Sequence, residues 1–302
     1  MLQDSWMLLQ QEIVLSVLIF ILLFIKLGAE KSNRFIFNVV NAGLLINLVL
    51  GFAITHEGQL FDGLFQINSV ITLEKNILNI AVLLISLQSY AWLEQQSNTI
   101  ELYILLLTSL LGMNLMISSG NFLLLYLGLE MSTIPLAAAA NFDLTKRKSS
   151  EAALKLILSS AFSSGILLMG ISFIYGISGS LQFSMIPAHI TDQPMHILAL
   201  VLFIAGFAFK ISAVPFHLWT ADVYEGAPVS ITAFLSVVSK AAVLFTLVAL
   251  LYKVFPNMTS TWSGMMTILA YLTILIGNLF AVRQENIKRF LAFSSITQVG
   301  FI

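Results

Sequence analysis

One stretch of the sequence combines an apolar run of membrane length with a break in helical pattern. Residues 196–228 read HILALVLFIAGFAFKISAVPFHLWTADVYEGAP. At about 1.5 Å per residue, the apolar part is long enough to cross a bilayer core of about 30 Å as a helix. Pro215 has no N–H and removes a helical hydrogen bond, and Gly226 and Pro228 interrupt the pattern again. The stretch predicts an all-α membrane protein with a broken helix near 209–228.

The predicted break is flanked by Lys210 and His217. Irregular backbone at membrane depth is tolerated only where it lines protein or water, and broken helices commonly mark ion sites. His217 follows Lys210 by two helical turns on nearly the same face, and an imidazole can accept and donate a proton near pH 7. A proline kink alone is common in membrane helices. A kink between these two groups favours an ion or proton site.

The composition agrees with a membrane location and excludes several classes of protein. Of 302 residues, 58% are hydrophobic and 10% are charged, whereas soluble domains carry about 25% charged residues. The net charge of −1 and the lack of a basic block argue against nucleic-acid binding. Without cysteine, the chain cannot ligate an iron–sulfur cluster through thiolates. We therefore expect no cofactor and no metal on this chain, and solvated roles for His56, His189 and His196.

Apolar windows predict a polytopic bundle of transmembrane helices. The first follows the N-terminus without a clear cleavage site, so we expect a retained span. A tenth window begins near 290 and runs to Ile302, and we expect the sequence to be the N-terminal part of a longer one. The nine complete windows are 13–29, 35–55, 76–93, 101–117, 121–140, 152–176, 196–217, 229–251 and 264–282.

The distribution of Lys and Arg predicts the orientation. Cytoplasmic loops carry an excess of these residues. Nine of them fall on one side and two on the other, which places the N-terminus outside. The two are Lys75 and Lys253, and the nine are Lys26, Lys31, Arg34, Lys146, Arg147, Lys148, Arg283, Lys288 and Arg289.

Glu130 and the three lysines that fit neither side of this count, Lys155, Lys210 and Lys240, fall inside predicted spans. Glu130 and Lys240 lie near the middle of theirs, Lys210 about a third of the way in, and Lys155 a few residues inside. A charge at the bilayer centre costs about 2.5–3.5 kcal/mol on insertion scales and marks a candidate functional site. A structural ion pair would explain Glu130 with one lysine but leaves other lysines without a carboxylate. A proton relay is favoured, although Lys155 could instead extend to the interface.

Four segments together form a specific combination of motifs. They are LYLGLEMSTIPL (125–136), RKSSEAALKLILSSAFSSGILLMG (147–170), FKISAVPFHLWTADVYEGAPVSITAFLSVVSKAA (209–242) and NIKRFLAFSSITQVGF (286–301). In this order they resemble the proton-conducting core of the antiporter-like membrane subunits of respiratory complex I, the NADH–quinone oxidoreductase. The form HLWTADVYEGAP is similar to subunit N, whereas subunits L and M and the cation/proton antiporters carry variants closer to WLPDAMEGPTPVS. Residues 1–99 agree in span layout more than in motif.

The resemblance implies a role for each buried ionisable residue. Glu130 matches the carboxylate of the fifth helix, which pairs with the lysine of the seventh helix, here Lys210. Lys155 matches the lysine of the sixth helix, and His217 follows the seventh-helix lysine in its motif. Lys240 matches the central lysine of the eighth helix, which hands protons along the membrane axis.

The resemblance also implies a division of the chain. Residues 1–99 would hold helices 1–3, and 100–252 the proton-conducting antiporter-like bundle of helices 4–8. Residues 253–302 would begin a second inverted repeat, most of which we expect beyond Ile302. Gln298 stands where many family members have histidine, which puts in doubt that side chain's part in a relay.

The resemblance implies a multi-pass protein of the bacterial inner (plasma) membrane. It would act within NADH:quinone oxidoreductase beside the other membrane subunits, the antiporter-like neighbours and the small subunits. NADH, FMN, iron–sulfur clusters and quinone would bind partner subunits, with no redox chemistry on this chain. Two alternatives stay open. One is a membrane subunit of a multi-subunit cation/proton antiporter or of a membrane-bound hydrogenase, and the other is a non-pumping scaffold that anchors a redox arm.

Overall fold

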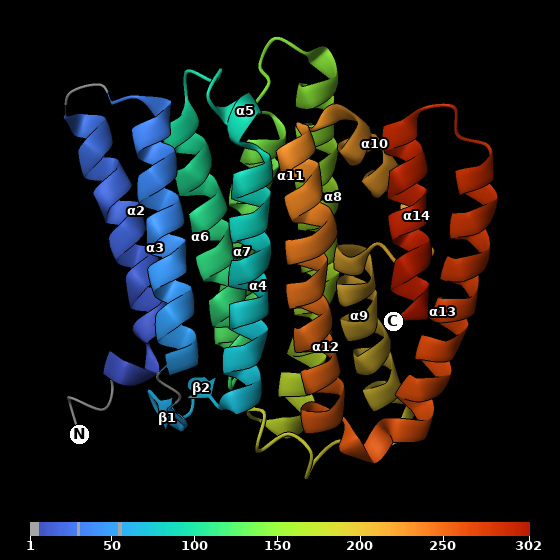
Figure 1. Ribbon diagram of the computed structural model, residues 1–302. Helices are drawn as coiled ribbons and strands as arrows, with labels where there is room; N and C mark the ends of the chain where they lie inside the picture. The colour runs from blue at the N-terminus through green and yellow to red at the C-terminus, as the bar shows by residue number, and fades with distance from the viewer. Residues whose placement is uncertain (1–5, 29–30, 54–55) are drawn as a thin grey trace. The chain divides into compact units, whose positions relative to one another are not determined.

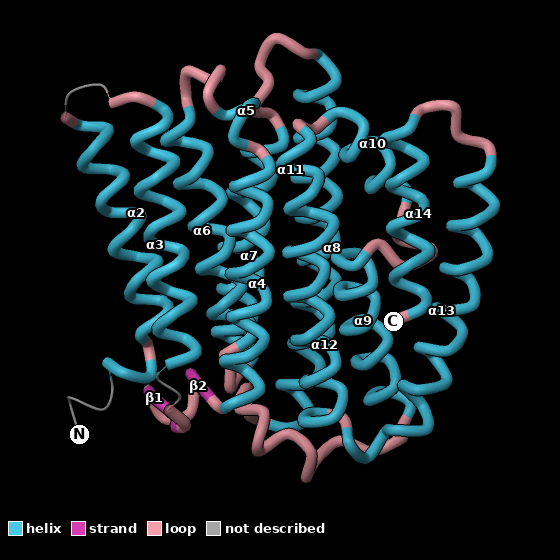
Figure 2. Tube along the Cα trace, viewed as in Figure 1, coloured by secondary structure: helices cyan, strands magenta, loops and turns pink. Residues whose placement is uncertain are grey.

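A computed structural model describes residues 6–28, 31–53 and 56–302. Helices dominate it, as Figures 1 and 2 show. Within the described residues, nine helices are long and apolar enough to cross a membrane. Lipid offers no partner for backbone polar groups, so long apolar segments must satisfy their hydrogen bonds internally as helices. The predicted polytopic helix bundle is confirmed.

The chain divides into two compact units. One contains residues 1–139 with 233–242, and the other contains 140–232 with 243–302. The domain limits expected from the sequence, near residues 99 and 252, stay a prediction.

The first unit is built mainly from the N-terminal helices. Helix α2 (Gln10–Leu27) packs against α3 (Asn33–Ala53) and α6 (Thr99–Ile117), and α4 (Ser69–Gln88) packs against α3 and α6. The unit also holds the short α5 (Tyr90–Leu93) and all but the last residue of α7 (Phe122–Ala140). Strands β1 (Gly58–Leu60) and β2 (Phe65–Ile67) form an antiparallel hairpin between α3 and α4 in the chain, with Gly58 opposite Ile67.

The second unit contains the break. Helix α8 (Arg147–Ser178) packs along α9 (Pro194–Ile211), and α10 (Leu218–Gly226) contacts α8 and α14 (Ile287–Phe301). Helix α13 (Thr259–Val282), preceded by the 3₁₀ turn η2 (Pro256–Met258), packs against α14.

One further span contributes to both units. It runs through α11 (Val229–Phe234), the π-helical turn η1 (Leu235–Ser239) and α12 (Lys240–Val254). Single π turns inside α-helices often occur at functional sites. Lys240 directly follows this one.

Helix α8 illustrates why these sequences suit a membrane. Leu154, Leu158 and Phe162, spaced by four residues, are exposed along one face. Positions four apart share a helix face, so this face can meet lipid tails. Polar Ser160 and Ser163 are buried instead. Over this stretch the helix therefore turns Ser160 and Ser163 inward and a row of large apolar side chains outward.

The third predicted span was placed too late in the sequence. Helix α4 begins at Ser69, where the Asn68 side chain caps it by accepting a hydrogen bond from the Ile71 N–H at 2.9 Å. Lys75 therefore lies inside the span and is buried, and it does not belong to a loop. The charges at Glu74 and Lys75 shortened the apolar window. Removing Lys75 from the orientation count leaves the bias of Lys and Arg in place.

Candidate functional site

The predicted break lies between α9 and α10. Helix α9 ends at Ile211, Ser212 has a left-handed φ of 67°, and α10 begins at Leu218. The freed backbone is satisfied from another helix, because the Val214 N–H donates to Thr273 Oγ1 of α13 at 3.0 Å. The broken helix is therefore a built feature with its polar groups paired, as expected for irregular backbone inside a membrane.

Lys210 occupies the last turn of α9, directly before the break, and is buried. Its ammonium donates a hydrogen bond to Ser160 Oγ of α8. One turn further along α8, Ser163 Oγ donates to the Gly206 carbonyl of α9 at 3.0 Å, and Ser164 is also buried. Serine residues of α8 thus line the part of α9 that carries Lys210. Hydroxyl groups can accept and donate at once, so these serines can pass protons to and from an amine.

His217 immediately precedes α10 and is buried. Its ring lies against Phe280 and Phe293, with centroid distances of 6.0 and 6.5 Å. Within the described residues neither ring nitrogen makes a side-chain hydrogen bond, and the polar neighbour is the backbone of Pro215. The aromatic rings hold the imidazole at the far end of the break from Lys210.

Lys155 lies about two turns into α8, because the helix begins earlier than the sequence suggested. Its side chain is 41% exposed. The ammonium lies 2.6 Å from Asp222 Oδ2 of α10 and 2.7 Å from Glu151 Oε1. Lys155 is therefore an ion-paired residue near the end of a helix.

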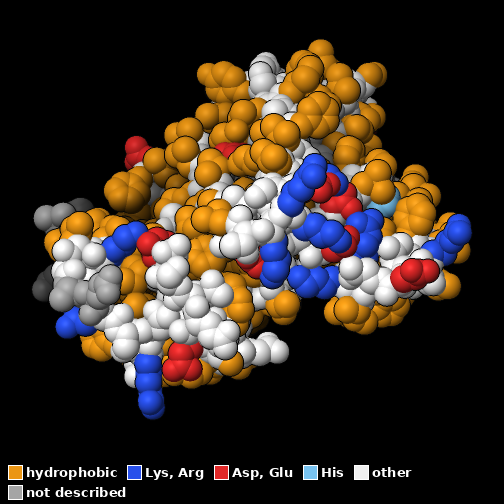
Figure 3. Space-filling view, turned by 90° about the horizontal axis from the view of Figure 1, so that it is seen from above, with side chains coloured by type: hydrophobic (Ala, Val, Ile, Leu, Met, Phe, Trp, Pro, Cys, Tyr) orange, Lys and Arg blue, Asp and Glu red, His pale blue; other side chains and the backbone are white. Residues whose placement is uncertain are grey.

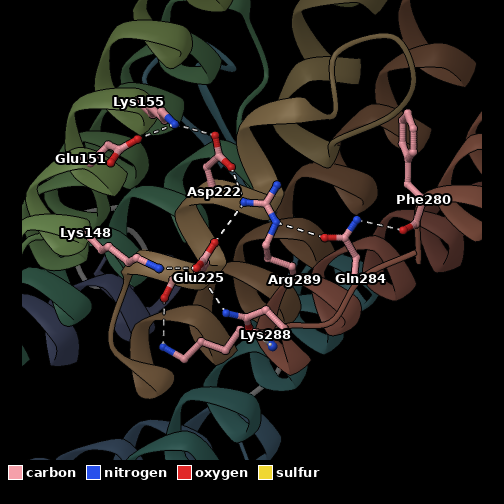
Figure 4. A network of polar contacts seen from close by, with 10 residues as sticks. Lys148, Glu151, Lys155, Asp222, Glu225, Phe280, Gln284, Lys288 and Arg289 are labelled. Carbon is pink, nitrogen blue, oxygen red and sulfur yellow. Dashed lines mark hydrogen bonds and ion pairs between the residues drawn. The ribbon is translucent and has the colours of Figure 1, made fainter. Parts of the chain in front are cut away.

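Asp222 and Glu225 of α10 are the acidic centre of a charged network (Figure 4). Arg289 of α14 binds Asp222 Oδ1 at 2.6 Å and Glu225 Oε2 at 3.0 Å. Lys148 of α8 lies 2.6 Å from Glu225 Oε1. Hydrogen bonds from Lys148 and Arg289 hold the pKa of Glu225 below its usual range. The network fixes α10, the second half of the broken helix, to α8 and α14.

The backbone supports the same network. Lys288 Nζ donates to the carbonyl of Ala227 at 3.0 Å, at the end of α10. A Cβ on Gly226 would lie 2.2 Å from the carbonyl oxygen of Lys148, so only glycine lets α10 approach α8 so closely. Figure 3 shows acidic and basic side chains intermixed in one area on this end of the molecule, bordered by hydrophobic ones.

Glu130 and Lys240 belong to the first unit, whereas Lys155, Lys210 and His217 belong to the second. Lys240 is buried, and the carboxylate atom Glu130 Oε1 is buried without a hydrogen-bond partner among the described residues. Tyr126, one turn earlier on α7, hydrogen-bonds Glu130. The expected pairing of Glu130 with Lys210 joins the two units and stays a prediction.

Sequence reasoning missed Asp222, Glu225 and Arg289, and also a buried pair in the first unit, Glu12 with Lys75 at 2.6 Å. Asp222 and Glu225 in DVYEG (222–226) and Arg289 in KR (288–289) belong to the quoted motifs, but the sequence alone assigned them no function. Their pairing depends on helices brought together by folding, which spacing along the chain cannot give.

The described residues contain no group of three or more His, Asp or Glu side chains that could hold a metal ion. The expectation that the chain carries no cofactor stays a prediction.

The comparisons with known proteins identify the family. The family model described as NADH:quinone oxidoreductase/Mrp antiporter, transmembrane, matches residues 119–302, which include the break and the charged network. The chain belongs to this family.

Two curated members of the NADH:quinone oxidoreductase/Mrp antiporter family are similar to most of the chain. NADH-quinone oxidoreductase subunit N of Azobacteroides pseudotrichonymphae is 43% identical over 99% of this chain and 64% of the relative. The subunit N of Phocaeicola vulgatus is 51% identical over 82% of this chain and 53% of the relative. The chain spans less than two thirds of the length of these relatives.

Two solved structures share the fold. A chain of respiratory complex I from Thermus thermophilus with bound Aureothin superimposes with a TM-score of 0.82 and 28% identity, covering 96% of this chain and 62% of that one. A chain of the Mrp complex from Dietzia sp. DQ12-45-1b gives a TM-score of 0.85 at 20% identity, covering 100% of this chain and 58% of that one. At that identity the second likeness concerns the fold alone.

Proposed function

We propose that this chain is a proton-translocating membrane subunit of the subunit N type in an NADH–quinone oxidoreductase. The observation that carries the proposal is Lys210, a buried lysine in the last turn of α9, immediately before a break in which Thr273 Oγ1 accepts the Val214 N–H. A buried lysine inside a span is costly and marks a candidate functional site, and broken helices in membrane proteins commonly form ion sites. The resemblance of HLWTADVYEGAP to subunit N and the two similar relatives support the type.

The proposed path begins at the cytoplasmic side of the break. Protons enter near His217 and reach Lys210, whose proton affinity depends on the charge of Glu130. Ser160 offers Lys210 a hydroxyl partner when the amine is charged. From there protons pass through water to Lys240 on the eighth span. Lys155, ion-paired to Asp222, sets the charge at the entrance and holds α10 in place.

The proposed orientation places the N-terminus outside, in a bacterial inner membrane. The loops and helix ends on one side carry nine Lys and Arg residues, against Lys253 alone on the other. The charged network lies on the basic side, which includes Lys148, Lys288 and Arg289. On the positive-inside rule this side is cytoplasmic.

Redox energy would come from partner subunits. The chain has no cysteine for an iron–sulfur cluster, and NADH, FMN and quinone chemistry is assigned to the rest of the complex. The partners we propose are the neighbouring antiporter-like subunits and the small membrane subunits. Many large apolar side chains are exposed on the helices, and both lipid and such partners can cover them.

Purification tests the assignment. The full-length subunit, tagged and extracted from membranes, should bring with it NADH–quinone reductase activity and, in vesicles, NADH-driven proton movement. Co-purification with a hydrogenase, or sodium/proton exchange without NADH, would support the alternative reading as a subunit of a hydrogenase or multi-subunit antiporter. That result would overturn the proposal.

A further inference from the structure

A buried ion pair joins α2 and α4 in the first unit and is not among the five predicted relay residues. Lys75 Nζ lies 2.6 Å from Glu12 Oε1, and the two side chains are 0% and 7% exposed. The ring of Phe65 in β2 covers the ammonium, with its centroid 4.9 Å from Nζ, a cation–π contact. The pair is therefore shielded from lipid and from bulk water.

Amide side chains adjoin this pair along both helices, Gln11 next to Glu12 and Asn76 next to Lys75. Gln11 Nε2 donates to Asn76 Oδ1 at 2.7 Å, which ties α2 to α4 beside the ion pair. A Cβ on Gly51 of α3 would lie 2.1 Å from Asn76 Oδ1, so glycine lets the amides press against α3. One turn further along α4, Asn79 Nδ2 donates to the Leu44 carbonyl at 2.9 Å. Three apolar helices thus enclose a polar cluster.

Several buried polar atoms of α2, α3 and α4 have no protein partner in the part of the chain that the structure describes. Within the described residues, the buried atoms Glu12 Oε2, Gln11 Oε1 and Asn79 Oδ1 make no hydrogen bond, nor does either amide atom of Asn47 on α3. Buried polar atoms are nearly always hydrogen-bonded to protein or to ordered water. Bound water is the ligand that fits a site of this chemistry.

Helix packing alone gives a weak reason for such a pair. Replacing a buried ion pair by apolar residues of similar size is often neutral or stabilising, and charges within a span are costly to insert. The pair can, however, exist either with both groups charged or with both groups neutral, and helix packing does not require this property. When water delivers a proton to Glu12 Oε2 and Lys75 Nζ gives up a proton, one O–H bond forms, one N–H bond breaks, and the net charge of the pair stays zero. The pair can therefore change protonation without creating an isolated buried charge.

We propose that Glu12 and Lys75 form a further proton-exchange site in α2–α4. Water held by Glu12 Oε2 and the neighbouring amides carries protons to and from the pair. The proposal rests on the proposed function of the chain as a proton-translocating subunit. It adds a protonatable site to the N-terminal helices, where the predicted relay has none.

The first test variant is Lys75→Arg in the full-length subunit, within the assembled complex. Arginine keeps the positive charge and can keep the ion pair, but its guanidinium does not release a proton in proteins. NADH-driven proton translocation into vesicles is measured per assembled complex. We expect translocation to fall while the amount of complex stays near that of the unmodified protein. Unchanged translocation in the assembled variant would overturn the proposal.

A second variant covers the case in which the larger arginine prevents assembly. Glu12→Gln with Lys75→Met removes both charges together, so neither partner is left as an unpaired buried ion. A purely structural pair predicts full translocation per assembled complex in this double variant. The proton-exchange site predicts a loss. Translocation per assembled complex in either variant is enough to support or refute the proton-exchange site.

A matched control is available on the same helix. Lys26 of α2 pairs with Glu101 of α6 at 2.5 Å, but the two side chains are 48% and 37% exposed. Lys26→Gln with Glu101→Gln should leave translocation unchanged. Lys210→Ala, measured in parallel, separates the proposed function from the additional proton-exchange site. If Lys210→Ala loses translocation while the Glu12 and Lys75 variants keep it, only the additional site is refuted.

Discussion

Asp222 of α10 is held from both sides, by Lys155 of α8 at one carboxylate oxygen and by Arg289 of α14 at the other, each at 2.6 Å. The second half of the broken helix is therefore anchored by charge in addition to its packing against α8 and α14, whereas the first half, α9, packs along α8. A short helix such as α10 has little stability of its own. Its position relative to Lys210 within the unit depends on this carboxylate.

Replacing Asp222 by asparagine should destabilise this part of the protein. The change removes two charge-assisted contacts and leaves Lys155 and Arg289 with fewer partners. Because the carboxylate is about a third exposed, we expect a cost of roughly 1–2 kcal/mol. A thermal unfolding curve of the solubilised complex measures it. Glu151→Gln is the control, since its carboxylate also binds Lys155 but is 57% exposed. An equal loss for both variants would contradict the anchoring role.

Gly226→Ala should force α10 away from α8. The new Cβ would lie 2.2 Å from the Lys148 carbonyl oxygen and 2.7 Å from Ala152 Cβ. Overpacking of this kind costs about 1–3 kcal/mol. Gly165→Ala on α8 meets nothing within 4 Å and should stabilise the helix by about 0.5–1 kcal/mol. Opposite shifts in unfolding temperature are expected, and a neutral Gly226→Ala would refute the close approach.

The bond between Thr273 and the break should matter for both stability and activity. Thr273 Oγ1 accepts from the Val214 N–H and donates to the Leu269 carbonyl at 2.6 Å. Thr273→Val leaves a buried N–H without a partner, at a cost of roughly 1–3 kcal/mol, whereas Thr273→Ser keeps the hydroxyl. Unfolding temperature and proton translocation are measured for both. Equal behaviour of the valine and serine variants would show that the hydroxyl does not support the break.

The sequence was sufficient to predict most spans, because lipid imposes one length and one secondary structure on apolar segments. The break was also predictable, since Pro215 removes a backbone donor wherever it stands in a helix. The sequence places the start of α4 too late, because the charge of Lys75 is typical of a loop residue. Nothing local shows that its charge meets Glu12, 63 residues earlier in the chain.

The candidate site was predictable only in part. Buried ionisable residues stand out in an apolar sequence, so Lys210 and Lys240 could be selected from position alone. Their partners could not, because a serine such as Ser160 carries no signal of its own in a helix with many serines. The anchoring of α10 depends on residues 67 positions apart in the chain, Lys155 with Asp222 and Asp222 with Arg289.

Lys210→Arg in the full-length subunit of the assembled complex tests whether Lys210 exchanges protons. Arginine can keep the charge and a hydrogen bond to Ser160, but it cannot release its proton. Proton translocation and coupled quinone reduction are measured in vesicles per assembled complex, with Lys31→Ala, an exposed lysine, as the control. We predict that both activities fall together in Lys210→Arg and stay normal in the control. Full translocation by an assembled Lys210→Arg complex would contradict the relay.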